Sequence, residues 1–149
     1  MAGQQMDPRL SVITLGVHDL ERSLAFYRDG LGWPTAGIIG TEFVGDENHP
    51  SGATVMFELA NGVILALYPR TELAKDAGEM LGAASATEFS LGYLTGGRED
   101  VDALIERART AGAAVTDEPH ERPWGIYSGY FKDVDGHLWE IIWNAQEPA

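Results

Sequence analysis

The chain has 149 residues, 44% of them hydrophobic and 22% charged, which is the balance of one ordinary globular domain with enough interior for a core. Its formal net charge of −13 argues against nucleic acid and anionic membranes as partners, because phosphate binding needs clustered lysine and arginine. The chain has no cysteine, which excludes disulfide bonds, thiolate nucleophiles and zinc–thiolate sites.

The N-terminal tail, residues 1–9, is polar and lacks the apolar stretch of a signal peptide, and no apolar run approaches the roughly 20 residues of a membrane helix. We therefore expect a cytoplasmic protein. Residues 10–17 are predicted to form the first strand, because β-branched and aliphatic side chains dominate them. Asp19 is an N-cap for the helix that follows, and glycines together with Pro34 end that helix.

The next segment predicts strands and a hairpin. Residues 38–44 indicate a short strand, and Asn61-Gly62 separates two apolar runs further on. Asn-Gly between apolar runs is typical of a two-residue hairpin turn, in which both positions need positive φ. A two-residue turn at this place puts Phe57 opposite Ala66.

The pattern then starts again after an alanine-rich linker, residues 70–86, which we expect to hold a short helix. Residues 89–94 predict a strand. A helix follows, with an apolar face at helical spacing and Gly112 as its C-terminal cap. A short strand is expected at 115–116, and two longer strands flank a turn cluster at 133–136.

These two halves form an internal repeat. Asn61-Gly62 corresponds to Asp135-Gly136, and Phe57 corresponds to Phe131 at the same offset, so Phe131 is expected to lie near Glu140. Each half reads strand, helix, then three strands, so the predicted fold class is α+β with two tandem βαβββ modules. The expected domain is 10–149, with module one at about 10–69, the linker at about 70–86 and module two at about 87–144.

Motifs at both ends of the repeat resemble the vicinal oxygen chelate superfamily, the glyoxalase/bleomycin-resistance/dioxygenase proteins. They are Val12-Ile13-Thr14-Leu15-Gly16-Val17, Asp19-Leu20-Glu21-Arg22-Ser23, Phe26-Tyr27, Leu31-Gly32, and Phe131 followed by Asp133-Val134-Asp135-Gly136-His137-Leu138-Trp139-Glu140. The family usually has proline where this chain has Val134. The resemblance covers roughly 10–144. It implies a cupped mixed sheet with helices on its outer face and, by analogy, a homodimer.

The resemblance also implies where a metal ion would bind. Metal-dependent members use four equivalent strand positions, which fall here on Val12, Ala66, Ser90 and Glu140. Only Glu140 is a normal ligand, because valine and alanine cannot coordinate a cation and serine binds transition metals poorly. A slip of two residues would substitute Glu88 for Ser90, and the set would still be incomplete. We therefore expect no metal and predict no cofactor, with a divalent metal as the alternative.

Period-two alternation places small residues on the inner strand faces, which leaves room for a cavity. Glu140 is its one carboxylate, with three open interpretations: no task, a contact to a ligand amine or hydroxyl, or general acid–base catalysis. Trp124 and Arg122 lie in a loop that could cover the cavity, and Arg122 could hold an anionic group. The alternative is that the aromatic residues only fill the core. The expected pocket comprises Val12, Thr14, Phe57, Ala66, Tyr68, Ser90, Gly92, Trp124, Tyr127, Phe131 and Glu140.

Weaker signals add no site. The run from Asp133 to Gly136 is not a calcium loop, because the loop-closing position is Asn144. The four histidines are expected to be solvated, and no nucleophile-elbow motif supports a Ser-His-Asp site.

The function that these observations favour is metal-independent binding of a small molecule, aromatic or cationic, in a protein that sequesters a drug or metabolite. The alternative is an enzyme, a metal-dependent lyase, isomerase or dioxygenase of the glyoxalase type. The superfamily hosts all of these activities, so the resemblance alone does not choose between them.

Overall fold

The structure is a computed structural model that describes residues 6–85 and 88–146. The first half consists of β1 (Val12–Val17), α1 (Leu20–Leu24), a π-helical continuation η1 (Ala25–Gly30), β2 (Ile38–Ile39), β3 (Thr54–Glu58), β4 (Ile64–Pro69) and α2 (Arg70–Ala77). The second half consists of β5 (Leu91–Leu94), α3 (Arg98–Ala111), β6 (Ala114–Arg122), a 3-10 turn η2 (Pro123–Gly125), β7 (Ile126–Lys132) and β8 (Leu138–Asn144). Of the two short strands expected from the sequence, β2 is shorter than predicted and β6 is much longer.

The strands form two four-stranded mixed sheets of the same topology, β1-β4-β3-β2 and β5-β8-β7-β6. In each sheet the first strand runs parallel to the last, and the other neighbours are antiparallel. This order confirms the predicted α+β class with two βαβββ modules. Among the described residues, no strand pairs with the outer edge of β1 or of β5, so the two sheets stay separate within the chain.

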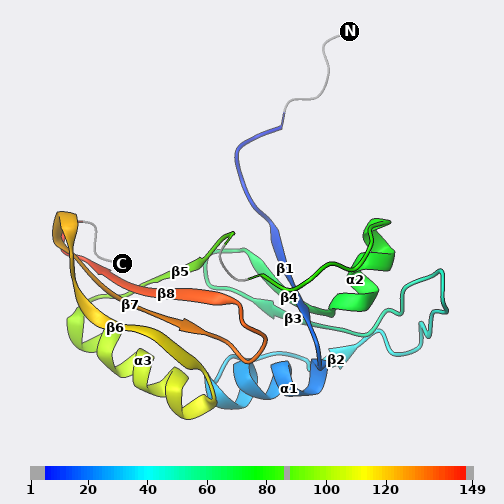
Figure 1. Ribbon diagram of the computed structural model, residues 1–149, viewed down its shortest axis with the longest axis horizontal. Helices are drawn as coiled ribbons and strands as arrows, with labels where there is room; N and C mark the ends of the chain where they lie inside the picture. The colour runs from blue at the N-terminus through cyan, green and yellow to red at the C-terminus, as the bar shows by residue number, and fades with distance from the viewer. Residues whose placement is uncertain (1–5, 86–87, 147–149) are drawn as a thin grey trace, which may run out of the picture.

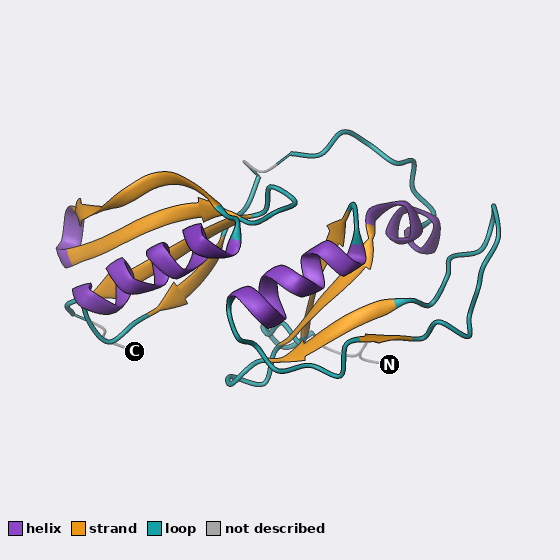
Figure 2. Ribbon diagram, turned by 90° about the horizontal axis from the view of Figure 1, so that it is seen from below, coloured by secondary structure: helices purple, strands orange, loops and turns teal. Residues whose placement is uncertain are grey.

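Helices α1 and α3 lie on one side of the sheets, whereas α2 lies on the other side, next to Gly16 of β1. Figure 1 shows α1 and α3 below the strands, and Figure 2 shows the two helices side by side when the molecule is seen from below. Val55 and Phe57 of the first sheet are fully buried on this side, as are Val101 and Ile105 of α3. One core cluster runs through both modules, because Tyr27 of η1 packs between aromatic side chains of the two sheets.

Local signals explain the helix ends. The Asp19 side chain accepts a hydrogen bond from the Arg22 backbone N–H at 3.2 Å, which satisfies an N-terminal donor of α1 as expected of an N-cap. Gly112 caps α3 with φ of 111°, a backbone conformation that favours glycine.

The described part of the chain contains no helix that is both long and apolar enough to cross a bilayer.

The hairpin turns differ from the prediction by one residue. The Leu59 N–H donates to the Val63 carbonyl at 2.9 Å, so the loop has three residues, 60–62, and of these only Gly62 has positive φ. The β7–β8 turn repeats this geometry around Gly136. A three-residue loop that ends in a left-handed glycine is a common alternative to the two-residue turn, and the predicted two-residue turn is therefore wrong.

The extra turn residue changes which side chains lie opposite one another in the paired strands. Phe57 pairs with Leu65 instead of Ala66, and Phe131 pairs with Trp139 instead of Glu140. Successive side chains of a strand point to opposite faces, so a shift of one residue moves a whole set of side chains to the other side of the sheet.

Candidate functional site

The side of the sheets opposite α1 and α3, hereafter the concave face, carries most of the predicted site residues. In the first sheet Thr14 pairs with Ala66, and Val12 and Tyr68 share their face by alternation. In the second sheet Gly92 pairs with Glu140. Ser90 is exposed just before β5, and Trp124 is 82% exposed in the η2 turn.

Three predicted pocket residues lie on the helix-facing side instead, as a consequence of the shifted register. Phe57 and Phe131 are buried in the core. Tyr127 pairs with Trp143, and its hydroxyl donates to Asp102 of α3 at 2.6 Å. The expectation that these three aromatic residues surround Glu140 is therefore wrong.

Glu140 is held by a neighbouring serine that the sequence analysis did not identify. Ser128 is fully buried, and its Oγ donates to Glu140 Oε2 at 2.8 Å. The same Oγ accepts a hydrogen bond from Arg122 Nε at 2.5 Å. A guanidinium, a hydroxyl and a carboxylate thus form one continuous hydrogen-bonded chain across β6, β7 and β8.

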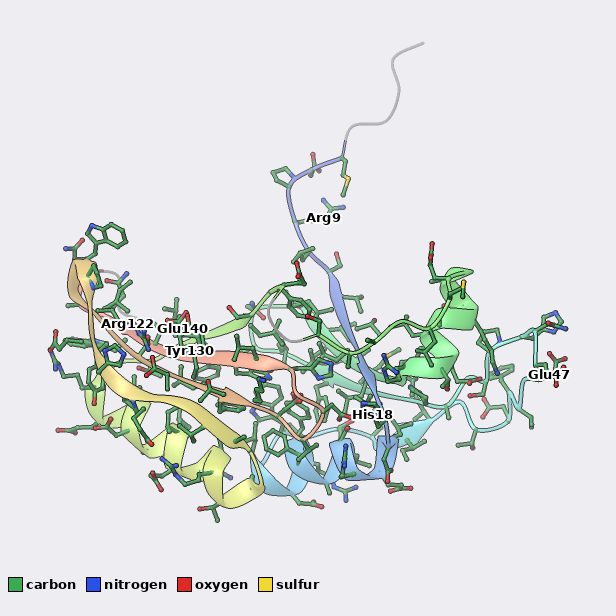
Figure 3. All side chains as sticks on the ribbon, viewed as in Figure 1. Arg9, His18, Glu47, Arg122, Tyr130 and Glu140 are labelled. Carbon is green, nitrogen blue, oxygen red and sulfur yellow. The ribbon has the colours of Figure 1, made fainter. Side chains whose placement is uncertain are left out.

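Tyr130 lies directly opposite Glu140 in the β7–β8 pair, and Figure 3 shows both beside Arg122 on the second sheet. The Arg122 guanidinium stacks over the Tyr130 ring at 5.1 Å from its centroid. Burial, and after it the neighbouring Glu140 carboxylate, raise the pKa of Tyr130, so its hydroxyl stays protonated and able to donate. Tyr130 takes the place beside Glu140 that was expected for Phe131.

Asp117 anchors the other end of this chain. Arg122 Nη2 donates to Asp117 Oδ2 at 2.7 Å, and His120 Nε2 lies 3.1 Å from the same oxygen. The hydrogen bond from Arg122, and after it the one from His120, lower the pKa of Asp117. Arg122 was expected at the rim of the cavity; its position is instead fixed by contacts on the concave face.

Comparison with known proteins agrees with this architecture. The family model of the Glyoxalase/Bleomycin resistance protein/Dioxygenase superfamily matches residues 9–141. The chain belongs to this superfamily. It is 30% identical over 138 residues to the uncharacterized protein YraH of Bacillus subtilis, covering 89% of this chain and 96% of that protein.

Solved structures of the superfamily superpose on this chain over nearly its whole length. A glyoxalase-related enzyme from Fulvimarina pelagi is 30% identical, with a TM-score of 0.75 over 92% of this chain and 88% of that one. The fosfomycin resistance protein FosX of Listeria monocytogenes is 23% identical, with a TM-score of 0.65 over 94% of this chain and 96% of that one. At that identity the second likeness shows the fold alone.

The residues at the superfamily's metal positions do not fit a divalent ion. Val12 and Ala66 have no donor atom, and one oxygen of Glu140 already accepts from Ser128. Within residues 6–85 and 88–146, no three histidine, aspartate or glutamate side chains lie close enough together to hold a metal. One carboxylate does not compete with water for such an ion.

The predicted pocket residues do not share one cavity in the single chain. Thr14 lines a cavity of about 550 Å³ at the junction of the modules beside β1. Phe57 and Gly92 line another, of about 740 Å³, beside β5. Glu140 belongs to the lining of neither cavity.

The turn cluster at 133–136 connects the modules. The Asp135 side chain is only 1% exposed and accepts hydrogen bonds from the His18 N–H, at 2.8 Å, and from the Ser23 hydroxyl. Asp133 accepts from the Tyr27 hydroxyl and lies 3.0 Å from His137 Nδ1.

His137 was expected to be solvated, and this is wrong, because its side chain is 16% exposed. Burial alone would lower the pKa of His137, but the hydrogen bond and charge of Asp133 outweigh it and raise the pKa. Burial likewise opposes ionisation of Asp133, whose pKa is nevertheless lowered by His137 and Tyr27.

Proposed function

We propose that this protein binds a small molecule on the concave face of the second sheet without a metal, through Glu140, Tyr130 and Arg122. The observation that carries the proposal is the hydrogen-bonded chain from Arg122 through the buried Ser128 to Glu140. A carboxylate whose orientation is fixed by a buried donor is prepared to accept further hydrogen bonds with little loss of side-chain entropy. Ser128 occupies one oxygen of Glu140, and the other oxygen is the acceptor for a ligand N–H or O–H.

The neighbours of Glu140 suggest the kind of ligand. The Tyr130 ring offers a flat apolar surface with a protonated hydroxyl at its edge. Arg122 adds positive charge at the end of the site that is distant from Glu140, although Asp117 balances part of it. We therefore expect a planar molecule with a hydrogen-bond donor, and sequestration of a drug or metabolite fits a site without catalytic metal ligands.

We further propose that a second copy of the chain completes the site. β1 and β5 are edge strands whose outer backbone groups have no strand partner among the described residues. Val12 and Leu94 on these strands are about half exposed. An unpaired strand edge with apolar side chains favours pairing with another chain. Placing β1 of one copy along β5 of the other brings the Thr14–Ala66 face beside the Gly92–Glu140 face.

A ligand screen by thermal unfolding tests the binding proposal, since a ligand that binds only the folded state raises the melting temperature by mass action. We expect a hit whose stabilisation is lost in Glu140→Gln and retained in Glu47→Gln, a matched control in a loop at the opposite end of the molecule (Figure 3). Hits that stabilise Glu140→Gln as much as the parent protein would refute binding at this site.

The competing function is a metal-dependent lyase, isomerase or dioxygenase, and the carboxylate retained at Glu140 is the observation that favours it. Metal analysis of protein purified without chelator distinguishes the two. We expect far less than one equivalent of any divalent metal per chain. If the protein holds one equivalent of divalent metal per chain and Glu140→Gln loses it, the metal-dependent enzyme would replace the binding proposal.

A further inference from the structure

The turn between β7 and β8 carries polar contacts from the second module to the first. The Asp135 carboxylate accepts hydrogen bonds from the His18 N–H, at 2.8 Å, and from the Ser23 hydroxyl. Asp133 accepts one from the Tyr27 hydroxyl. Figure 1 shows this turn beside the end of β1. Within residues 6–85 and 88–146 no strand pair joins the two sheets, so the modules are held together by these contacts and by their common core.

The imidazole of His137, in the same turn, lies between two hydrogen-bond acceptors. Its Nδ1 is 3.0 Å from Asp133 Oδ2, and the ring also donates to the backbone carbonyl of Gly16, on β1 of the first module. A carboxylate and a carbonyl only accept hydrogen bonds, and a neutral imidazole has a single N–H to donate, whereas an imidazolium has two. Both contacts are therefore satisfied together only when His137 is protonated.

The surroundings of His137 favour this protonated form. Burial lowers the pKa of His137, but the hydrogen bond and charge of Asp133, and after them the charge of Asp135, outweigh burial and raise the pKa. The side chains of both aspartates are only 1% exposed, so water screens their charges little. Tyr27 of η1 remains a neutral donor to Asp133, because burial and that carboxylate raise the pKa of its hydroxyl.

Other charged or titratable side chains approach the turn from β1, α1, α2, the linker and β7. They line the cavity next to His137 or contact Asp135, and they are His18, Arg22, Arg70, Glu79 and Lys132. The arginines and the lysine oppose protonation of His137, and Glu79 favours it. The carboxylate of Asp133 acts over the shortest distance, so its contact with the ring decides the direction.

We infer that His137 is a pH-sensitive latch between the two modules, which joins the β7–β8 turn to β1 only while its ring carries both protons. A neutral ring that keeps its N–H on Asp133 turns a bare nitrogen toward the Gly16 carbonyl, and two acceptors repel each other. The other tautomer places that nitrogen against the Asp133 carboxylate. In either case the junction loses a contact and opens locally more often. The latch does not involve Glu140, so it holds or fails independently of the proposed function.

The direction of the pH effect follows from the raised pKa. The latch is fully formed below about pH 6.5, the ordinary pKa of histidine, and is lost as the pH rises through the raised pKa of His137. Amide hydrogen exchange of the intact protein between pH 6 and 9, corrected for the intrinsic rate, measures the opening. The reporter is the His18 N–H, which is bonded across the junction to Asp135. Its protection factor should fall about fivefold or more over this range.

NMR titration of the same protein provides the second half of the test. The ring protons of His137 give the midpoint of its titration, and the fall in His18 protection should have the same midpoint. Below it, nitrogen chemical shifts should show both ring nitrogens of His137 protonated. A protection factor that is the same at pH 6 and pH 9, a midpoint that differs from that of His137, or a ring with one protonated nitrogen at pH 6 would overturn the inference.

Three variants assign the effect to His137. In His137→Gln the protection of the His18 amide should no longer depend on pH. His120→Gln is the matched control, because His120 also contacts an aspartate but lies on β6, within the second module. His18→Gln tests the other histidine beside the cavity. Both controls should retain the pH dependence of the parent protein. Persistence of the dependence in His137→Gln, or its loss in either control, contradicts the latch, and the titration of the parent protein decides the question even where His137→Gln does not fold.

Discussion

Replacing Ser128 by alanine removes the hydroxyl that joins Arg122 to Glu140. Both hydrogen bonds involve a charged partner, and each such bond contributes about 1.5–3 kcal/mol. Arg122 and Glu140 are only partly buried, so water replaces some of what is lost. We therefore expect Ser128→Ala to lower the free energy of unfolding by about 2 kcal/mol. That loss corresponds to a fall in melting temperature of roughly 4–8 °C for a chain of this size.

Urea unfolding of a double-mutant cycle measures this effect. The cycle consists of Ser128→Ala, Glu140→Ala and the combined variant, and we expect a coupling free energy of about 1 kcal/mol with unchanged dependence on urea. Ser90→Ala, at an exposed serine just before β5, is the control and should stay within about 0.5 kcal/mol of the parent protein. Additive effects within about 0.5 kcal/mol would refute the Ser128–Glu140 interaction.

Three further outcomes follow from the junction and the turns. Asp135→Asn should lower the free energy of unfolding by about 2–3 kcal/mol in urea titrations, because the buried carboxylate accepts hydrogen bonds from the first module. A loss below about 0.5 kcal/mol would contradict that role. The pKa of His137 is raised above 6.5, so its stabilisation is full below that pH and is lost as pH rises through the raised pKa. The stability difference between the parent protein and His137→Gln should therefore shrink with rising pH, whereas a pH-independent difference would show that Asp133 does not pair with it. Gly62→Ala should lower the free energy of unfolding by about 1 kcal/mol in urea titrations, because Gly62 has a φ of 85°, and Asn61→Ala should lower it by less. Equal losses in the two variants would indicate a two-residue turn, in which both positions need positive φ.

Features that depend on a few neighbouring residues were predictable from the sequence. The N-cap at Asp19 and the glycine cap at Gly112 are both found where expected. The spacing of apolar residues predicted α3, and the repeat of turns and strands predicted two βαβββ modules. β6 was mostly missed because it alternates between exposed and half-buried polar residues and contains a proline, so its apolar signal is small.

The hairpin register shows where local reasoning fails. Asn-Gly fits a two-residue turn and also a three-residue turn in which only the glycine has positive φ, so the turn alone does not fix the pairing. The alternation of apolar side chains within β3 indicates the correct pairing. Val55 and Phe57 must share the buried face, which leaves Met56 opposite Ala66, as the structure has it. Burial of large apolar side chains outweighs the preference of a single turn.

The sequence by itself determined the modules and their helices, because these follow from composition and from short-range periodicity, and the family resemblance identified Val12 and Ala66 as positions without a metal donor. Only the tertiary structure decided the surroundings of Glu140. Ser128 and Tyr130 reach it across a strand pair from ten or more residues away in the chain, and Arg122 reaches it through Ser128. Those contacts depend on register, and register depends on which face of each strand the whole core can bury.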